Sequence, residues 1–419
     1  MSEEPKPAPS PSERPKDLGP VDSGRFAPQS ELTRGKAIMH GVMVLLLLYV
    51  FLVGVNALSG GIKGLGKGVM DSYLGQGMNP MLGLLAGILA TTLVQSSSVT
   101  TALIVGFVAS GNLSVSSAVP MIMGANIGTT VTNTIASLAH ANQAGEFRRA
   151  FAAATCHDFF NFLSVLTFLP LELLTRALTG QGILERISGA VAGMITSGSG
   201  TKYKSPLKAA FKWGATQVKD FAGLFSSDKK VAAILMAVFG IIIIFAALTG
   251  IVKLMRALVM TRLENYVNRF LGSGGPVGIV VGIVLTVMVQ SSSITTSVMV
   301  PLAGAGLVTL AQVFPITLGA NVGTTITALI ASAAVAAETP EQAKQALAAR
   351  QIALVHLSFN LAGILVWYAP PPLRKIPLRM AEWLADFAAE KRRWAIAYVA
   401  FVFYGVPALI FFASRAIFG

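Results

Sequence analysis

The polar sequence Gln-Ser-Ser-Ser occurs twice in this chain, each time in the middle of a long apolar run, at Gln95–Ser98 and at Gln290–Ser293. Amide and hydroxyl oxygens are hard ligands that suit a small hard cation without adding a fixed charge. Polar groups left unsatisfied in hydrocarbon cost several kcal/mol. We therefore expect both clusters to contact protein partners or a water-filled cavity rather than lipid.

Two further blocks repeat in the same order as the polar clusters. Gly124–Thr130 returns as Gly319–Thr325, and the offset of 195 residues equals the separation of Gln95 and Gln290. The pattern His-x-x-Phe-Asn at His157 returns at His356, with an offset of 199 residues. Two halves that each carry a broken, polar-centred segment are typical of secondary transporters, whose binding site lies between the repeats.

The composition indicates an integral membrane protein. Of the 419 residues, 53% are hydrophobic and only 12% are charged, which is about half the charged fraction of a soluble protein. The chain carries a net charge of +13. We attribute this charge to lysine and arginine in loops next to the membrane, and we expect no nucleic-acid partner. The single cysteine, Cys156, excludes an intrachain disulfide.

We divide the chain into four parts. Residues 1–35 are rich in proline, serine and charge and are predicted to form a disordered tail. Residues 36–200 form the first transmembrane repeat, 201–230 a polar loop between the repeats, and 231–419 the second transmembrane repeat. Arg34 and Lys36 favour a cytoplasmic N-terminus, but the loop at 201–230 is also basic, so the charge pattern leaves the orientation open.

The polar clusters predict re-entrant hairpins. The run Met81–Ala109 would overshoot a bilayer core of about 30 Å as one straight helix, at about 1.5 Å per residue. We expect it, and Pro276–Gly306, to fold back with the serines at the tip. Val115–Leu138 and Leu307–Ala334 are expected to be spans interrupted near their glycines. The predicted fold is an all-α membrane protein with two inverted-topology repeats, each with a re-entrant helical hairpin and an interrupted transmembrane helix.

Other polar residues inside the apolar segments are candidate ligands. Asn126 and Asn321 are equally well explained as cation ligands and as partners in interhelical hydrogen bonds. The glycines of the repeated block are better explained by close helix packing. Asp158 is the acidic residue well inside a predicted span, and its counterpart is Leu357. An intramembrane carboxylate indicates function, and the alternative is a buried ion pair with Arg148 or Arg149.

These motifs together resemble the type II sodium-dependent phosphate cotransporters. The resemblance covers residues 36–415 and includes both Gln-Ser-Ser-Ser tips, the run at 124–134, the run from Glu146 to Asn161, and segments 318–325 and 352–365. It implies symport of inorganic phosphate, the divalent ion HPO4, with sodium as the coupling ion and no other cofactor. Electrogenic members share the pattern Ala-x-Ala-x-x-x-Asp, which stands here as Ala152–Asp158. The short central loop, without cysteine or asparagine, is typical of a bacterial member.

The resemblance assigns site residues by position. It places phosphate at Gln95, Ser96, Ser97, Ser98, Gln290, Ser291, Ser292 and Ser293. The candidate sodium ligands are Gln290, Ser291, Thr324, Thr327, Gln95, Asp158, Asn126 and Asn321.

The expected protein is not an enzyme but a multi-pass transporter of the cell (inner) membrane. Its partners are phosphate, sodium and the lipid bilayer, and its oligomeric state is open. Transport of another small anion, coupled to sodium or protons on the same scaffold, is the main alternative. A channel and an intramembrane serine hydrolase using Ser97 or Ser292 are weaker alternatives, because a hydrolase needs a base beside its nucleophile and the repeats contain no such motif.

Overall fold

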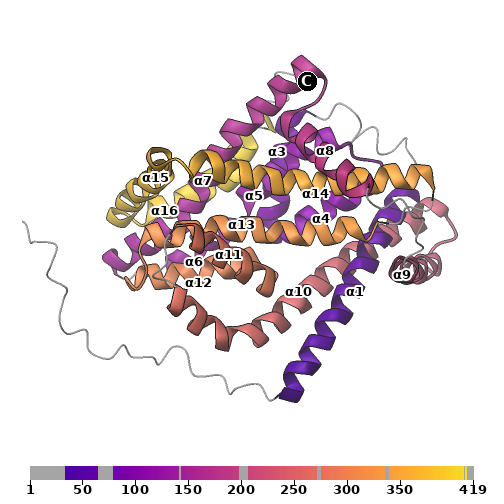
Figure 1. The fold of residues 1–419 in the computed structure, drawn as a ribbon, viewed down its shortest axis with the longest axis horizontal. Helices are drawn as coiled ribbons and strands as arrows, with labels where there is room; N and C mark the ends of the chain where they lie inside the picture. The colour runs from indigo at the N-terminus through magenta and orange to yellow at the C-terminus, as the bar shows by residue number, and fades with distance from the viewer. Residues whose placement is uncertain are drawn as a thin grey trace, which may run out of the picture.

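Each apolar run with a Gln-Ser-Ser-Ser sequence forms two helices rather than one in the computed structural model (Figure 1). The structure describes residues 34–64, 79–140, 143–197, 206–270, 275–335, 339–409 and 411–412. Residues 1–33 of the tail predicted for 1–35 lie outside the described residues.

The described part of the chain is helical and contains no strand. The long helices of the first half are α1 (Arg34–Gly64), α3 (Pro80–Val94), α4 (Ser97–Ala109), α5 (Val115–Gly128), α6 (Val131–Ser137), α7 (Ala144–Thr179) and α8 (Ile183–Ser197). After α9 (Pro206–Gly223) come α10 (Lys229–Phe270), α11 (Pro276–Val289), α12 (Ser292–Gly304), α13 (Leu310–Ala333), α14 (Pro340–Trp367), α15 (Pro371–Glu390) and α16 (Arg393–Ala400). A 3-10 turn, η1 (Leu138–His140), and a π-helical turn, η2 (Phe401–Gly405), follow α6 and α16.

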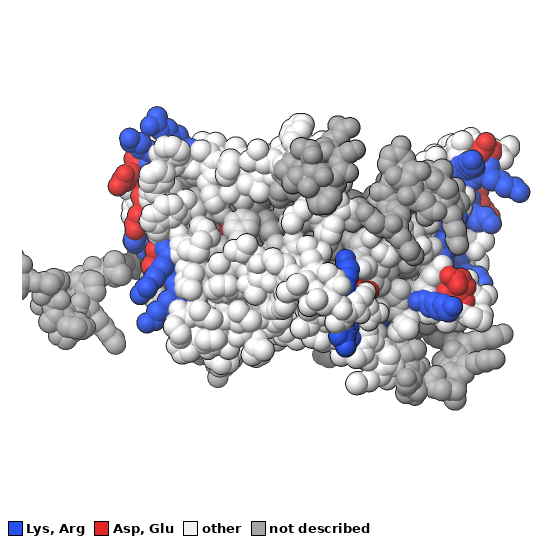
Figure 2. Space-filling model, turned by 90° about the horizontal axis from the view of Figure 1, so that it is seen from above, with Lys and Arg blue, Asp and Glu red and all other residues white. Residues whose placement is uncertain are grey.

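Several helices have the length and composition of membrane spans. Among the described residues these are Ile38–Gly64, Ala144–Thr179, Lys229–Leu254, Leu310–Ala333 and Pro340–Trp367. On the face drawn in Figure 2, most charged side chains gather near the two ends of the long axis, and a smaller charged group lies between them on a surface that is otherwise largely uncharged. This distribution fits a multi-pass membrane protein, as the composition predicted.

The first helices of the two halves, α1 and α10, pack against each other in opposite directions (Figure 1). Gly54 of α1 lies against Ile243, and Gly61, further along α1, lies against Ala237, which precedes Ile243 in α10. Residue numbers therefore rise along α1 as they fall along α10, so the two helices are antiparallel. The missing side chains of the glycines allow this close approach.

The glycines of the repeated block bring α5 onto α3 and α13 onto α11. A Cβ at Gly124 would overlap the backbone carbonyl of Leu84, and a Cβ at Gly319 would overlap that of Ile279. The two contacts are equivalent under the 195-residue offset. The packing role predicted for these glycines is confirmed. The second helix of each tip then packs across the molecule, with α4 against α13 and α14, and α12 against α6 and α7.

Two predictions about element boundaries are wrong. The second repeated block does not interrupt its helix, because α13 runs unbroken from Leu310 to Ala333, whereas α5 and α6 are separated at Thr129 and Thr130. Glycine weakens a helix interior by only about 1 kcal/mol, and packing against α11 offsets that cost. The polar connection predicted as a loop at 201–230 contains helix α9, because its buried face, including Ala215 and Ala222, packs near Met236 of α10 and Ala57 of α1.

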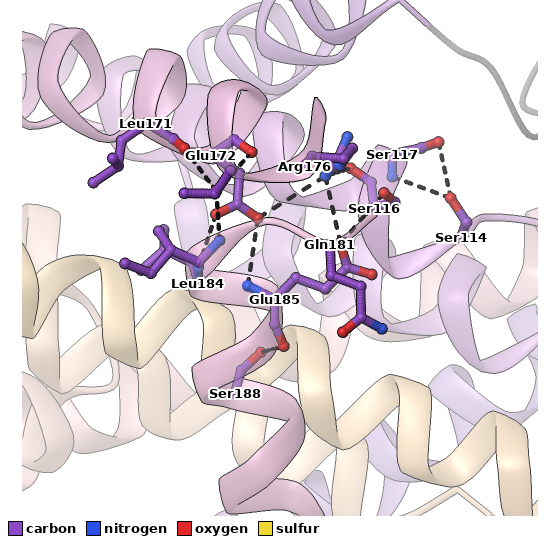
Figure 3. A network of polar contacts seen from close by, with 12 residues as sticks. Ser114, Ser116, Ser117, Leu171, Glu172, Arg176, Gln181, Leu184, Glu185 and Ser188 are labelled. Carbon is purple, nitrogen blue, oxygen red and sulfur yellow. Dashed lines mark hydrogen bonds and ion pairs between the residues drawn. The ribbon is translucent and has the colours of Figure 1, made fainter. Parts of the chain in front are cut away.

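A buried carboxylate fixes the turn between α7 and α8 (Figure 3). Glu172 of α7 accepts hydrogen bonds from the backbone N–H groups of Leu184, at 2.8 Å, and Glu185, at 3.4 Å, in the first turn of α8. Arg176 lies 3.9 Å from Glu172 and 3.6 Å from the Glu185 carboxylate. A carboxylate at a helix start satisfies free N–H groups and complements the helix dipole, so α8 is held firmly to the end of α7.

Candidate functional site

Both tips break the helix by the same backbone conformation. Gln95 has φ of 54° and Gln290 has φ of 55°, and these are the non-glycine residues with positive φ in the described part of the chain. The left-handed region costs an L-residue about 1–2 kcal/mol. Two glutamines at equivalent positions that share this strain indicate a site feature rather than a local accident.

Each tip then starts a new helix with a serine cap. Ser96 Oγ accepts a hydrogen bond from the Val99 N–H at 3.3 Å, and Ser291 Oγ accepts one from the Ile294 N–H, also at 3.3 Å. The serines that follow, Ser97 and Ser292, are buried. The first N–H groups of α4 and α12 lie at these caps, and such helix starts carry partial positive charge that favours anions.

The second tip brings together two of the predicted sodium ligands. The Thr327 hydroxyl of α13 donates to Gln290 Oε1 at 3.3 Å, while Gln290 Nε2 donates to the Val287 carbonyl at 2.6 Å. Thr324 is buried one turn earlier on α13, and its hydroxyl donates to the Ala320 carbonyl at 3.1 Å. The structure thus brings Thr327 into contact with Gln290 at the tip, and Thr324 lies one helical turn away on the same face of α13.

The first tip is arranged differently. Gln95 is exposed, and the hydroxyl of Thr132, the counterpart of Thr327, is buried with no hydrogen-bond partner. Ser98 is buried. Among the described residues, no hydrogen bond joins one Gln-Ser-Ser-Ser sequence to the other.

The asparagines of the repeated block cross between the halves. Asn126 Oδ1 lies 2.9 Å from His356 Nε2, and Asn126 Nδ2 donates to Asn360 Oδ1 at 2.7 Å. In the reciprocal contact Asn321 Oδ1 lies 2.7 Å from His157 Nε2, and Asn321 Nδ2 donates to Asn161 Oδ1 at 2.9 Å. An amide oxygen only accepts, so each histidine Nε2 carries the proton. All six side chains are buried.

Both polar atoms of each asparagine amide are thus engaged by the opposite half. Of the two explanations for Asn126 and Asn321, this geometry favours the interhelical hydrogen bond over the cation ligand. The pattern is also reciprocal, because the contact of an asparagine in one half with a histidine and an asparagine of the other half is made in both directions.

Asp158 stands apart from this symmetry. Its side chain is fully buried, and its Oδ2 accepts hydrogen bonds from the Tyr398 hydroxyl at 2.7 Å and the Thr134 hydroxyl at 3.3 Å. Its Oδ1 is buried and has no hydrogen-bond partner. One oxygen is therefore held, and the other is free to accept a cation.

The alternative ion pair for Asp158 is wrong. Arg148 instead forms a two-pronged contact with Asp386 of α15, in which Nη2 donates to Oδ2 at 3.1 Å. Arg149 donates from Nε and Nη2 to the Gly304 carbonyl at 2.9 and 2.6 Å, at the end of α12. Both guanidinium groups are satisfied away from the carboxylate.

Comparison with known proteins decides the family. The Na+/Pi-cotransporter family model matches residues 50–185 and 243–376, once in each half. The chain belongs to this family. It is 33% identical to sodium-dependent phosphate transport protein 2A of Rattus norvegicus, over 91% of this chain and 69% of the relative. It is 32% identical to sodium-dependent phosphate transport protein 2B of Homo sapiens, over 92% of this chain and 67% of the relative. No solved structure matches.

Two polar residues of this cotransporter escaped the sequence reasoning. Asn133 Oδ1 accepts hydrogen bonds from Thr296 at 2.9 Å and Ser297 at 3.0 Å, which ties α6 to α12. Tyr398, on α16, binds the Asp158 carboxylate. Each is a polar residue in an apolar segment, which is a signal that could have marked them. Asn133 has Ala328 as its counterpart, and Asp158 has Leu357, so neither polar side chain is repeated in the second half.

Proposed function

We propose that this protein imports inorganic phosphate, as the divalent ion, together with sodium, and that each cycle moves net positive charge inward. Membership of the Na+/Pi-cotransporter family supports the coupling of phosphate to sodium. The observation that carries the site assignment is the pair of equivalent tips, at which Gln95 and Gln290 share one strained conformation. We place the protein in the cell (inner) membrane.

The two tips supply groups that suit phosphate and groups that suit sodium. The N–H groups at the starts of α4 and α12 favour the phosphate oxygens, while Gln95–Ser98 and Gln290–Ser293 offer hydroxyl and amide groups. The Thr327–Gln290 contact of 3.3 Å supports a sodium site made by Gln290, Ser291, Thr324 and Thr327. No arginine is needed to neutralise phosphate when sodium ions accompany it.

The helix arrangement supports alternating access between inverted halves. If α1, α5–α6 and α7 cross the bilayer while the α3–α4 pair enters and leaves on one side, the first half crosses three times. An odd number of crossings inserts the second half in the opposite orientation. The antiparallel packing of α1 on α10 agrees with this topology, in which the tips enter from opposite sides and re-entrant backbone is satisfied by protein or water.

Asp158 supplies the site for the sodium ion that makes the cycle electrogenic. A divalent phosphate with two sodium ions carries no net charge, and a third sodium at the free Oδ1 of Asp158 adds one positive charge. The membrane potential then contributes about 2.3 kcal/mol per charge for each 100 mV. An inside-negative potential therefore drives accumulation.

The test is uptake of radiolabelled phosphate by purified protein in liposomes, with a sodium or a potassium gradient. We expect accumulation with inward sodium alone, and faster uptake when a potassium diffusion potential makes the interior negative. Gln290→Ala and Gln95→Ala should each impair uptake, whereas Ser110→Ala, outside the tips, serves as the matched control. Equal uptake from sodium and potassium buffers would overturn the proposal.

A second assay separates phosphate transport from transport of another small anion on the same scaffold. Counterflow with unlabelled phosphate, sulfate, arsenate and a dicarboxylate should show exchange with phosphate and its close analogue arsenate. Stronger exchange with sulfate or the dicarboxylate would favour the alternative substrate.

A further inference from the structure

Tyr398 reaches Asp158 from outside the segments that match the family model. The family match in the second half ends at residue 376, and α16, which carries Tyr398, begins at Arg393. The Tyr398 hydroxyl lies 2.7 Å from Asp158 Oδ2, across 240 residues of sequence. A helix beyond the segments that match the family model therefore completes the surroundings of the carboxylate.

The tyrosine ring is held in place by aromatic neighbours. Its centroid lies 6.2 Å from that of Phe151 on α7 and 6.4 Å from that of Phe403 in η2, both edge to face. Phe151 and Phe403 are fully buried. The ring is thus fixed by packing that does not depend on its hydroxyl, so the hydroxyl is aimed at a defined point.

The two hydroxyl donors on Asp158 both contact the same oxygen. Tyr398 at 2.7 Å and Thr134 at 3.3 Å occupy Oδ2, and buried Oδ1 has no partner. Donors gathered on one oxygen fix the rotation of the carboxylate about its terminal bond, which is otherwise a soft torsion. The orientation leaves Oδ1 as the free ligand atom.

We propose that Tyr398 is a positioning residue for the potential-coupled sodium: by holding Asp158 Oδ2 it presents Oδ1 to the ion. The inference rests on the proposed sodium role of Asp158. Groups that hydrogen-bond to metal-ligating carboxylates typically change metal affinity by about 10- to 100-fold when they are removed. Tyr398 then sets the sodium affinity of this one site without touching sodium or phosphate.

The variant Tyr398→Phe removes the hydroxyl and keeps the ring that packs on Phe151. We expect it to raise the sodium concentration that half-saturates uptake by about tenfold, and to weaken the response to an inside-negative potential. Maximal uptake at saturating sodium and the midpoint of thermal unfolding should change little. The control is Tyr404→Phe, because Tyr404 lies six residues further along and is 50% exposed; it should match the unmodified protein.

A double variant shows whether Tyr398 acts through Asp158. In an Asp158→Gly background, Tyr398→Phe should cause no further loss, because there is no carboxylate left to position. A structural role would instead add its loss to that of Asp158→Gly. Thr134→Val, which removes the other donor to Oδ2, should shift the sodium dependence in the same direction and serves as a second test if Tyr398→Phe folds poorly.

The outcomes separate this inference from the proposed function. If the unmodified protein takes up phosphate with no dependence on sodium or potential, the proposed function fails. If it shows both dependences, and Asp158→Gly abolishes the response to potential, but Tyr398→Phe retains unmodified sodium dependence, the positioning role is refuted and the function stands. If Tyr398→Phe causes the same loss in the Asp158→Gly protein as in the unmodified protein, the positioning role is refuted as well.

Discussion

The crossed pair of Asn126 and His356 allows a quantitative test of how the two halves hold together. Replacing Asn126 by alanine removes two buried hydrogen bonds, of 2.9 Å to His356 Nε2 and 2.7 Å to Asn360 Oδ1. Single interhelical hydrogen bonds in membrane proteins contribute about 0.6 kcal/mol on average and about 1.7 kcal/mol at most. Two lost bonds predict a destabilisation of about 1–3.5 kcal/mol, and burial of the orphaned partners favours the upper half of this range.

A double-mutant cycle isolates the contact itself. The single variants Asn126→Ala and His356→Ala and their combination are compared by reversible unfolding in detergent micelles. The coupling energy should be about 1 kcal/mol, and the reciprocal pair Asn321 and His157 should give a similar value because its geometry is equivalent.

The control for this cycle pairs Asn126→Ala with Thr339→Ala. Thr339 caps the start of α14, the helix that carries His356, but lies about 25 Å away along it at about 1.5 Å per residue. The control coupling should be near zero, since distant substitutions add. A coupling of zero for Asn126 with His356, or one no larger than the control, would refute the reasoning from the crossed hydrogen bonds.

Three further predictions test other parts of the molecule. Gly319→Ala forces a Cβ into a backbone carbonyl of α11, whereas a Cβ added at Gly193, inside α8, would meet open space. We expect the first substitution to lower stability by about 2 kcal/mol or more, and Gly193→Ala to raise it by up to about 1 kcal/mol because alanine favours a helix interior, as read from the unfolding midpoint. Gln290→Gly should be more stable than Gln290→Ala by about 1 kcal/mol, because glycine accepts positive φ, yet both should need more sodium for half-maximal uptake. Hydrogen bonding to the Arg148 guanidinium lowers the pKa of Asp386. The pair therefore stabilises the fold above the ordinary carboxyl pKa of about 3.9, and the effect is lost as pH falls through the lowered pKa. Asp386→Asn should cost under about 1 kcal/mol at pH 7, and the cost should shrink as unfolding is measured at pH values progressively below the ordinary carboxyl pKa.

The sequence predicted those features that repeat. Two copies of Gln-Ser-Ser-Ser in apolar runs marked the helix breaks, because polar groups in a membrane demand a special environment, and the repeated glycines marked the close helix packing. The family followed from the same motifs. These signals are local, so spacing along the chain was enough to find them.

The contacts between the halves could not be predicted in this way. Asn126 and Asn321 were equally compatible with a ligand and with a hydrogen bond, and only the pairing of α5 with α14 and of α13 with α7 distinguishes the two. The continuity of α13 depends on packing against α11 rather than on its own residues. Tyr398 lies in a terminal apolar segment whose pattern contains nothing that points to Asp158.

The reciprocal hydrogen bonds have a consequence for how such a protein can become asymmetric. The contacts of Asn126 with His356 and of Asn321 with His157 are those of an isologous dimer, so two separate copies of one half, inserted in opposite directions, would satisfy them equally well. A homodimer, however, carries any substitution twice. Asp158 opposite Leu357, and Asn133 opposite Ala328, need two halves of different sequence, and one polypeptide that contains both halves provides them. Covalent fusion thus allows a single carboxylate, Asp158, between halves whose asparagine and histidine contacts are reciprocal.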